Sequence, residues 1–400
     1  MHRTFQSVAT LLLLLPLLLP VRAPAAPLAD AYTLTDLGEV LVAGVDPLQP
    51  LVAGTLLGPN QVAALLFPVP VPLGFLPGGT FSIAAAICNG ETVGLCGTGP
   101  FSLFTHACTF TGPGGLIDEG TLGDPDLFSA ATSCNLSLVV AGYAEVPDRS
   151  HLEPTLWEEG VPRTLRLLTD QHSAFLNAIN DAGYSAGAAT DEAGVIHAAF
   201  WSFAGAVFDL GANSEARGIN NRGGEIVVQD HAPVSQAGVY RSDGKHVLAP
   251  LEGLETSEGD GLDDDGNVLG ASVTEGETPG STIRVATLWD VQDQPVALQP
   301  RVTNADGWQL QRVLSRNTQG LIAGEGLFQG VRHGFVLTPV GAPPDALVAT
   351  VPSDPVAPST PQDRAHAMRA IEAQLVMHRV LHPAISTVVA ERMHRAFHRD

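Results

Sequence analysis

Residues 177–211 have the sequence NAINDAGYSAGAATDEAGVIHAAFWSFAGAVFDLG, and this stretch decides the fold. Its first apolar run ends at a polar turn, Asn180-Asp181-Ala182-Gly183, and a second run closes at Gly187. After a loop come a third run, His197 to Trp201, and a fourth, Phe208 to Gly211. Four strand-length segments separated by turn residues are typical of a small antiparallel sheet.

The same unit recurs along the chain. Its second segment aligns in seven copies, which close at Gly54, Gly94, Gly142, Gly187, Val228, Gly270 and Gly324. Four-stranded units repeated every ~40–50 residues are typical of β-propeller blades; a β-solenoid and a string of separate small sheets are the competing architectures. One unit is too small to bury both of its faces, so neighbouring units must stack. We therefore predict an all-β, seven-bladed β-propeller-like domain.

The two ends of the repeat region favour a closed ring. The last copy ends at Phe335-Val336-Leu337 and runs into Pro339 without a fourth strand. A spare segment of the fourth-strand type, Tyr32 to Gly38, stands before the first copy. Pairing this segment with the last copy would remove an exposed sheet edge, which is how propellers avoid aggregation. We predict that the ring closes in this way.

The quoted residues also resemble a known repeat. The segments INDAG, HAAFW and FDLG are similar to the HAF repeat of bacterial extracellular proteins, which is named for its His-Ala-Phe triplet. His106, His197 and His333 occupy the histidine position of that triplet. The resemblance covers roughly Tyr32 to Thr338 and implies export and a repetitive β-fold. It implies no catalytic residue.

The chain begins with the pattern of a secretory signal, which we assign to residues 1–25. Arg3 precedes a Leu-rich core, Val8 to Val21, and Ala23-Pro24-Ala25 offers a small-x-small cleavage site. The core is short for a membrane span and contains two prolines, so an uncleaved anchor is disfavoured. We expect a secreted, periplasmic or extracellular protein without a membrane span after cleavage.

The composition changes after the repeat region, residues 26–342. Residues 343–361 are rich in Pro, Ala, Ser and Val, which is typical of an extended linker. In residues 362–400 apolar side chains recur at helical spacing, and Pro383 divides two predicted helices. Two histidine pairs in these helices have a usable metal-ligand spacing, but a solvated or partner-facing helix surface is favoured. We expect this tail to dock on the domain or to mediate oligomerisation.

The chain is strongly acidic, with 20 basic and 42 acidic residues and a net charge of −22, and the acidity lies in the repeat region. Such a protein is a poor partner for nucleic acid and for anionic membrane surfaces. Nearly all of its basic residues are arginine, which points to a GC-rich and hence bacterial genome.

All four cysteines lie between residues 88 and 134. In an exported protein an even, clustered set indicates two disulfides, with three connectivities open, and zinc is disfavoured because no CxxC pair occurs. Cys96 ends a predicted second strand and Cys108 lies in a third, so they could face each other across a hairpin. Cys88 and Cys134 stand at matching positions of adjacent copies, in ICN and SCN, and could join two blades. We hypothesise these two pairs.

The segment Gly183-Tyr184-Ser185-Ala186-Gly187 matches the GxSxG nucleophile elbow of α/β-hydrolases. That elbow requires a strained turn from a strand into a helix. Here a turn and a strand are predicted instead, and other copies carry GETVG or GNVLG at the same position. We therefore assign both glycines to the repeat and predict no catalytic residue.

Asp263, Asp264 and Asp265, followed by Gly266, are candidate oxygen ligands for Ca²⁺. They lack the alternating spacing of an EF-hand loop, and they coincide with the Asx/Gly turn of the repeat, where Asp is favoured for its turn geometry. We therefore prefer the turn and expect no cofactor, with Ca²⁺ as the one candidate.

The three triplet histidines would lie on separate blades, in the third strand, away from the axis. We expect each of them to bind a turn backbone within its own blade rather than to share a metal.

No combination of acid, base and nucleophile stands out in the sequence. It favours a non-enzymatic binding or surface-interaction module that uses the loops on one face of the ring, with a protein or glycan ligand. The alternative is a secreted polysaccharide hydrolase or lyase, because acidic propellers can place paired carboxylates at the axis.

Overall fold

The computed structural model describes residues 28–57, 61–99, 105–232, 234–276 and 281–341. The predicted signal (1–25), linker (343–361) and helical tail (362–400) lie outside the described residues. Among the described residues no helix is long and apolar enough to span a membrane.

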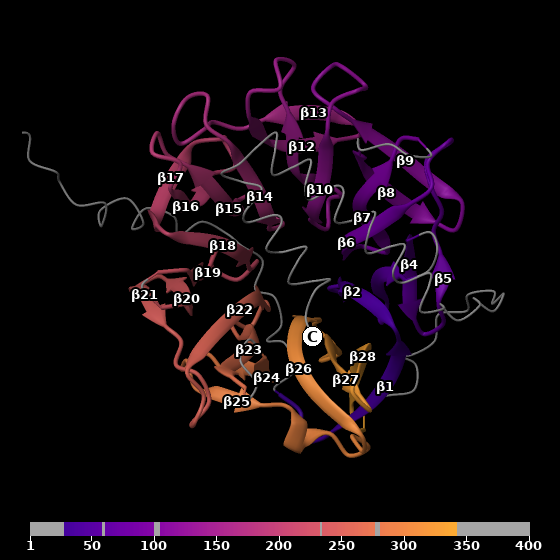
Figure 1. The fold of residues 1–400 in the computed structure, drawn as a ribbon, viewed down its shortest axis with the longest axis vertical. Coiled ribbons are helices and arrows are strands. Elements are labelled where there is room, and N and C mark those ends of the chain that lie inside the picture. Colours follow the sequence, from indigo (N-terminus) through magenta and orange to yellow (C-terminus); the bar gives the residue numbers. More distant parts are fainter. Residues whose placement is uncertain (1–27, 58–60, 100–104, 233, 277–280, 342–400) are drawn as a thin grey trace, which may run out of the picture.

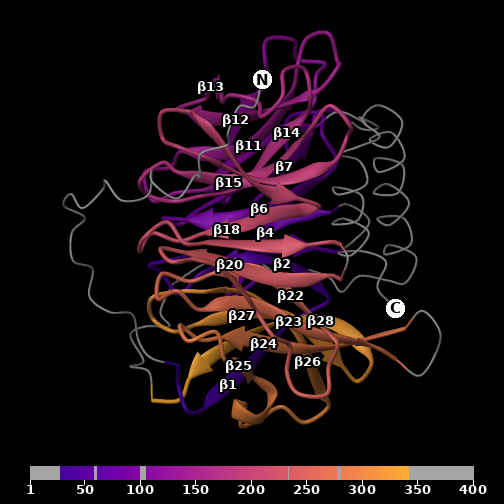
Figure 2. The ribbon, with the colours of Figure 1, turned by 90° about the vertical axis from the view of Figure 1, so that its left-hand side faces the viewer.

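Seven four-stranded antiparallel sheets stand around a central axis, and they form a closed seven-bladed β-propeller (Figure 1). Seen from the side, the ring is flatter than it is wide (Figure 2). Blades 1 to 3 contain β2 to β5 (Val40–Val45, Val52–Leu56, Val62–Phe67, Val71–Pro72), β6 to β9 (Ser82–Cys88, Glu91–Gly97, Thr105–Gly112, Gly115–Gly120) and β10 to β13 (Ser129–Cys134, Val140–Glu145, Leu152–Glu158, Val161–Thr164).

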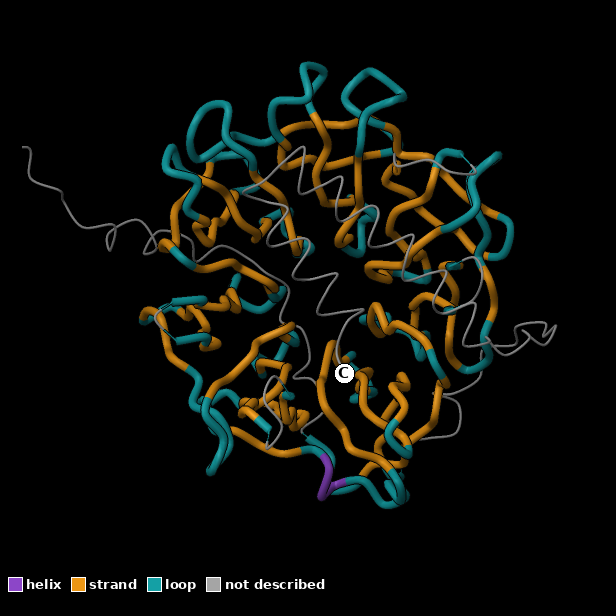
Figure 3. Tube along the Cα trace, viewed as in Figure 1, coloured by secondary structure: helices purple, strands orange, loops and turns teal. Residues whose placement is uncertain are grey.

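Blades 4 to 6 contain β14 to β17 (Ala174–Ile179, Ser185–Thr190, Ile196–Trp201, Val207–Ala212), β18 to β21 (Ser214–Ile219, Ile226–Asp230, Gln236–Arg241, Gly244–Val247) and β22 to β25 (Thr256–Leu262, Val268–Glu275, Thr282–Trp289, Pro295–Ala297). Blade 7 contains β26 to β28 (Trp308–Arg316, Ile322–Phe328, Val331–Pro339) and β1 (Tyr32–Gly38). A short 3₁₀ helix, η2 (Gln299–Arg301), lies between blades 6 and 7 (purple in Figure 3). In blades 1 to 6 the first strand lies nearest the axis and the fourth lies at the rim.

The first strand of the chain closes the ring. β1 pairs antiparallel with β28, with Thr33 opposite Thr338 and Asp36 opposite Phe335. It therefore supplies the fourth strand that blade 7 would otherwise lack. The predicted all-β, seven-bladed fold and its closure by residues 32–38 are both confirmed.

A β-bulge at the same place in each inner strand explains the repeat glycines. Opposite the bulge, the second strand carries glycine in six of the seven blades and Val228 in blade 5. A Cβ atom on Gly187 would lie 2.0 Å from the carbonyl oxygen of Phe175, far inside van der Waals contact. Gly183 occupies the preceding turn with a φ of 77°, a left-handed conformation that favours glycine. Ser185 is fully buried in β15, so GYSAG is part of the repeat, as expected from the sequence.

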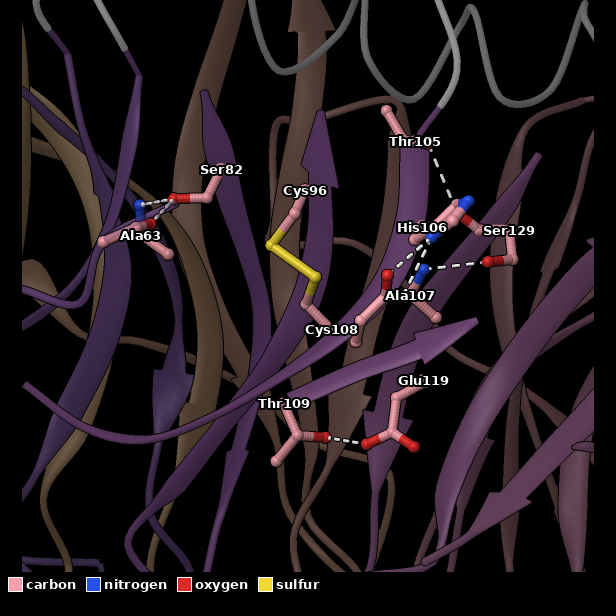
Figure 4. The surroundings of a disulfide bond; sticks show 12 residues. Ala63, Ser82, Cys96, Thr105, His106, Ala107, Cys108, Thr109, Glu119 and Ser129 are labelled. Carbon is pink, nitrogen blue, oxygen red and sulfur yellow. Dashed lines mark hydrogen bonds and ion pairs between the residues drawn. A yellow bond between two sulfur atoms is a disulfide. The ribbon is translucent and has the colours of Figure 1, made fainter. Parts of the chain in front are cut away.

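Serine side chains join neighbouring blades at the start of four inner strands. Ser129 Oγ accepts a hydrogen bond from Ala107 N (2.9 Å) in the preceding blade and donates one to Gly120 O (2.6 Å). Ser82 binds blade 1 in the same way, and Figure 4 shows Ser82 beside Ala63 and Ser129 beside Ala107. The other two are Ser214 and Ser257. Because the donor in each case lies in the third strand, these bonds fix each inner strand against the blade before it.

Candidate functional site

All seven inner strands end at one face of the ring, which we call the mouth. In each inner strand one residue pairs with the repeat glycine, or with Val228 in blade 5. The residue four positions further along the chain is the equivalent position of each blade. We call these residues the mouth ring: Asp46, Cys88, Asn135, Asn180, Asn220, Asp263 and Asn317. Six of the seven are Asp or Asn, and blade 2 has cysteine.

The Asp and Asn side chains of the mouth ring stabilise the turns that follow them. Asn180 Oδ1 accepts hydrogen bonds from the backbone N–H groups of Ala182 (3.1 Å) and Tyr184 (3.0 Å). Asp263 Oδ1 accepts the corresponding bonds from Asp265 (3.0 Å) and Asn267 (2.8 Å). These are Asx turns, which satisfy backbone donors that the strand ladder does not reach.

The amide groups of the same asparagines connect blades 3 to 6. Asn135 Nδ2 donates to Asn180 O (3.2 Å), Asn180 Nδ2 to Asn220 O (3.0 Å), and Asn220 Nδ2 to Asp263 O (3.4 Å). One side chain thus holds its own turn with its oxygen and the next blade with its nitrogen. All four residues are buried, so these bonds are shielded from water.

A second series of bonds runs one residue further along. Leu136 N donates to Asp181 Oδ1 (2.9 Å), Asp181 N to Asn221 Oδ1 (2.6 Å), and Asn221 N to Asp264 Oδ1 (2.9 Å). Together the two series form what we call the Asx ladder, comprising residues 135–136, 180–181, 220–221 and 263–264. It explains why Asp and Asn occur in pairs at these turns.

Blades 6 and 7 are joined by an ion pair instead. Asp263 has no amide to donate, and Arg316 Nη1 donates to its Oδ2 (2.7 Å) and to Asp265 Oδ2 (3.1 Å). Arg316 is buried at a position that is apolar in the other six blades. The residues at that position there are Val45, Ile87, Cys134, Ile179, Ile219 and Leu262.

The remaining junctions at the mouth use three further devices. Asn317 Nδ2 donates to Gln49 O (3.1 Å) between blades 7 and 1, and Gly90 N donates to Asp46 Oδ2 (2.7 Å) between blades 1 and 2. Blades 2 and 3 are joined by the Cys88–Cys134 disulfide. Every pair of neighbouring blades is therefore linked at the mouth.

Both disulfides pair as the sequence suggested. Cys88 is bonded to Cys134. Cys96 is bonded to Cys108 within one hairpin of blade 2 (Figure 4). One part of the reasoning was wrong, because Cys88 and Cys134 do not stand at matching positions. Cys88 pairs with Glu91 across a two-residue hairpin and is equivalent to Asn135. The shorter turn of blade 2 shifts the alignment by one residue.

A cavity of about 150 Å³ lies in the mouth, lined by residues of all seven blades. Just before the mouth ring the strand ends contribute apolar groups, with Arg316 as the charged exception, and four mouth-ring residues also line the cavity, namely Cys88, Asn135, Asp263 and Asn317. The turns of blades 1 and 3 contribute Pro47 and Leu136, while those of blades 4 to 7 contribute Asp181, Asn221, Asp264 and Thr318. The lining is thus mostly apolar at blades 1 to 3, which we call the apolar side, and mostly polar at blades 4 to 7, the polar side. Small-molecule sites commonly combine an apolar lining with a few fixed polar groups.

The three candidate Ca²⁺ ligands belong to this network. Asp263 forms the Asx turn expected from the sequence and binds Arg316, which Asp265 binds as well. Asp264 accepts hydrogen bonds from both the backbone and the amide of Asn221. Within the described ranges, no group of three or more His, Cys, Asp or Glu residues is arranged to hold a metal ion.

The triplet histidines each bind an aspartate, so the expectation of turn-backbone partners alone was wrong; His106 also contacts a turn carbonyl, that of Pro125. His106 Nδ1 lies 2.9 Å from both carboxylate oxygens of Asp118, and His197 Nδ1 lies 3.0 Å from those of Asp209. His333 Nδ1 lies 2.8 Å from Asp36 Oδ1. The reason is that the fourth strand pairs with the third and brings an aspartate beside the histidine. The sequence signal was present but missed, since all three of these blades carry Asp-x-Gly in the fourth strand.

These His–Asp pairs lie near the start of the third strand, at the end of the ring opposite the mouth, which we call the far end. His106 Nε2 is also 2.9 Å from Pro125 O. Burial lowers the pKa of His106, but its bonds to Asp118 and Pro125 outweigh burial and raise that pKa above its ordinary value. For Asp118, burial acts upward on the pKa, but the bonds from His106 and Gly120 N prevail and lower it.

Two glutamates of blade 2 have raised pKa values. Glu119 is buried and accepts a hydrogen bond from Thr109 Oγ1 (2.5 Å); burial raises its pKa despite that bond (Figure 4). Burial also raises the pKa of Glu91. Neither residue is among those that line the mouth cavity.

Comparison with known proteins identifies no family for the chain. No family model matches, and no curated protein matches either. Among solved structures, TolB from Acinetobacter baumannii is 12% identical with a TM-score of 0.40, and the match covers 62% of this chain and 63% of that one. YCF48 bound to D1 peptide is 11% identical with a TM-score of 0.39 (80% and 98% covered). The fungal Aleuria aurantia lectin is 12% identical with a TM-score of 0.32 (68% and 98% covered). Likeness at this level carries no argument about activity or ligand.

Proposed function

We propose that this chain is an exported, non-enzymatic binding module and that the mouth cavity is its ligand site. The observation that carries the proposal is the cavity itself, in which all seven blades meet and an apolar side faces a polar side. The Asx ladder holds the polar groups in place before any ligand arrives, which lowers the entropic cost of binding. The two disulfides fit an oxidising, extracytoplasmic compartment, and the resemblance to the HAF repeat supports export.

The polar groups of the mouth are better suited to hydrogen bonding than to acid–base catalysis. Asp263 and Asp264 already bind Arg316 and Asn221, so their carboxylates hold the turns together. A ligand would meet fixed acceptors and donors on one side, and Leu136 and Pro47 on the other. Sugar rings and peptide side chains both present such a combination of polar and apolar edges.

The size of the cavity limits what enters it. Its volume of about 150 Å³ is well below the ~300–1,000 Å³ of sites that enclose a drug-sized ligand. We therefore propose that one terminal sugar of a glycan, or one side chain of a protein partner, occupies the mouth. The rest of the ligand would lie over the turns around it.

Glycan and peptide arrays probed with the purified full chain test this function. Leu136→Arg would introduce a long cation into the cavity, and Val161→Arg, at an exposed position of the same blade, is the matched control. We expect Leu136→Arg to weaken binding to the array hit by at least about tenfold, which corresponds to ~1.4 kcal/mol, and the control to bind like the wild type. Unchanged binding by Leu136→Arg would show that the mouth is not the site.

A second candidate function, polysaccharide hydrolysis or lysis, is favoured by Glu119. A buried carboxyl group with a raised pKa stays protonated at a higher pH and can act as a general acid. The same glycans should therefore be screened for cleavage products, with Glu119→Gln beside the wild type. Turnover that Glu119→Gln abolishes, without loss of folding, would replace the binding function by the enzymatic one.

A further inference from the structure

The two disulfides differ in their access to solvent. Cys88–Cys134, which we call the mouth disulfide, joins blades 2 and 3, and both of its cysteines line the mouth cavity. Cys96–Cys108, the core disulfide, joins β7 to β8 within one hairpin (Figure 4). Cys96 and Cys108 are both 0% exposed, whereas Cys88 and Cys134 are 4% and 6% exposed. A reductant must bring a thiolate onto a sulfur atom, so access helps to decide which bond is reduced first.

We propose that the mouth disulfide is a redox-modification site, at which a small dithiol reduces Cys88–Cys134 and leaves Cys96–Cys108 intact. The dithiol approaches through the mouth cavity, which Cys88 of blade 2 and Cys134 of blade 3 both line. The reduction itself needs no ligand, whereas its effect on ligand binding rests on the function proposed above.

The exchange balances without a further reactant. A thiolate of the dithiol attacks one sulfur atom of the Cys88–Cys134 bond, forms a mixed disulfide and displaces the other cysteine as a thiolate. The second thiol of the reagent then attacks the mixed disulfide and releases the first cysteine. Two electrons pass to the protein, Cys88 and Cys134 end as thiols after proton uptake, and the reagent ends as a cyclic disulfide.

Reduction would act on the mouth end of a single junction. Between the same two blades, the Ser129 bonds to Ala107 N and Gly120 O and the bond between His106 and Pro125 O lie at the far end. Blade 3 also stays tied to blade 4 through Asn135. Loss of the mouth disulfide should therefore let the hairpin of blade 2 separate from the turn of blade 3, while the ring stays closed.

This separation would change the shape of the cavity. Cys88 and Cys134 are part of its wall, and Leu136 follows Cys134 by two residues on its apolar side. The polar side is held by the Asx ladder and the Arg316 ion pair, and it should keep its geometry. Oxidation and reduction would thus regulate the apolar side of the mouth selectively.

Differential labelling tests the proposal on the full chain. The protein is incubated with increasing dithiothreitol, alkylated with iodoacetamide and mapped by peptide mass spectrometry. We expect Cys88 and Cys134 to be labelled at concentrations on the order of tenfold lower than those needed for Cys96 and Cys108. Equal labelling of all four cysteines, or earlier labelling of Cys96 and Cys108, would overturn the proposal.

Hydrogen exchange measures the structural consequence. In the partly reduced protein we expect faster exchange in residues 88–91 and 135–139 and unchanged exchange in residues 105–108. The double variant Cys88→Ser/Cys134→Ser should exchange like the reduced wild type, and the reduced wild type alone suffices if that variant does not fold. Faster exchange spread over all blades would contradict a local effect.

Binding is then measured separately with the ligand found on the arrays. Reduced and oxidised protein should differ in affinity if the mouth is the ligand site. Because labelling and exchange are read without any ligand, a failure of the redox site and a failure of the binding function give different results.

Discussion

Two regions of the mouth, blades 3 to 6 and the junction between blades 2 and 3, are held together in different ways. From blade 3 to blade 6, buried asparagine and aspartate side chains repeat one pattern of hydrogen bonds from turn to turn. Around blade 2 that pattern is missing, and a covalent bond from Cys88 to Cys134 takes its place. The difference shows that a junction between blades is required at this level, whereas its chemistry is free to vary.

The length of the turn explains where the pattern breaks. In blade 4 the chain needs several residues to pass from Ile179 to Ser185, and Asn180 satisfies their backbone groups. In blade 2 the chain reverses at Asn89-Gly90, both with positive φ, in a two-residue hairpin. Such a hairpin lacks the longer turn whose N–H groups the Asx side chain accepts in blade 4, and its Gly90 N donates to Asp46 Oδ2 of blade 1 instead. A residue that reaches the next blade without capping a turn is sufficient there, and cysteine does so.

The largest expected effect comes from removing the mouth disulfide. Cys88→Ala/Cys134→Ala opens a loop of 46 residues, and we expect the free energy of unfolding to fall by ~4 kcal/mol, since a longer loop gains more entropy in the unfolded chain. Cys96→Ala/Cys108→Ala opens a loop of only 12 residues and should cost ~3 kcal/mol. Denaturant unfolding of the two double variants measures the order. If the core pair cost more than the mouth pair, the covalent junction would matter less than we infer.

The next largest effect concerns the ion pair between Arg316 and Asp263, which takes the place of an Asx-ladder bond between blades 6 and 7. Arg316→Ile restores the apolar residue found in blades 4 and 5 but leaves the buried carboxylate of Asp263 without its cation. We expect a loss of ~3 kcal/mol in the free energy of unfolding.

Adding Asp263→Asn supplies the amide present in the other ladder blades. The double variant should recover at least half of the loss, because a neutral, hydrogen-bonded pair needs no counter-charge. A double-mutant cycle from denaturant unfolding gives the coupling. Strictly additive costs would mean that Arg316 does more than neutralise Asp263.

The sequence predicted the architecture well because its signals are local. The turn residues, the glycine forced by close approach at Gly187, and the spare segment Tyr32 to Gly38 each constrain the backbone where they stand. These signals led to seven blades and to the correct closure. The pairing of the cysteines followed too, although the shorter turn of blade 2 displaced the alignment by one residue.

The site was less predictable because it is built from contacts between copies. Arg316 is visible in the sequence as a charged residue in SRN, where blades 4 and 5 have AIN and GIN. Its partner Asp263 lies in the preceding blade, and only the closed ring shows that the two meet. The His106–Asp118 pair was missed for a related reason, since the two residues lie in different strands and meet only when β9 pairs with β8.

A moderate effect should follow from breaking one step of the Asx ladder. Asn180→Ala removes an acceptor for two turn N–H groups and a donor to blade 5, and the Asn180 side chain that makes these bonds is buried. We expect a loss of ~2 kcal/mol in the free energy of unfolding. Asn135→Ala removes the same set of bonds one blade earlier and should cost a similar amount.

The control for both is Ser137→Ala, an exposed position in the same turn as Asn135, which should change stability by less than ~0.5 kcal/mol. Thermal and denaturant unfolding measure all three variants. A large cost at Asn135 with none at Asn180 would show that the ladder is not a uniform structure.

The smallest effect depends on pH and concerns the far end of the same junction. His106 has acceptors at both ring nitrogens, Asp118 and Pro125 O, which suits the doubly protonated ring. The pKa of His106 is raised in the folded protein. Its contribution to the free energy of unfolding is therefore complete below the unfolded pKa of about 6.5 and is lost as pH rises through the folded pKa. The pKa of Asp118 is lowered in the folded protein. Its contribution to the free energy of unfolding is therefore present above the unfolded pKa of about 3.9 and is lost as pH falls through the folded pKa. The pair therefore stabilises the protein most at mildly acidic pH, between these limits.

His106→Gln should lower the free energy of unfolding by ~1 kcal/mol at about pH 5.5, a figure reduced for the partial exposure of Asp118, and by less at about pH 8.5. Denaturant unfolding of wild type and variant at both pH values measures the difference, and a cost that grows with pH would reverse the assignment of the charged form to the folded state.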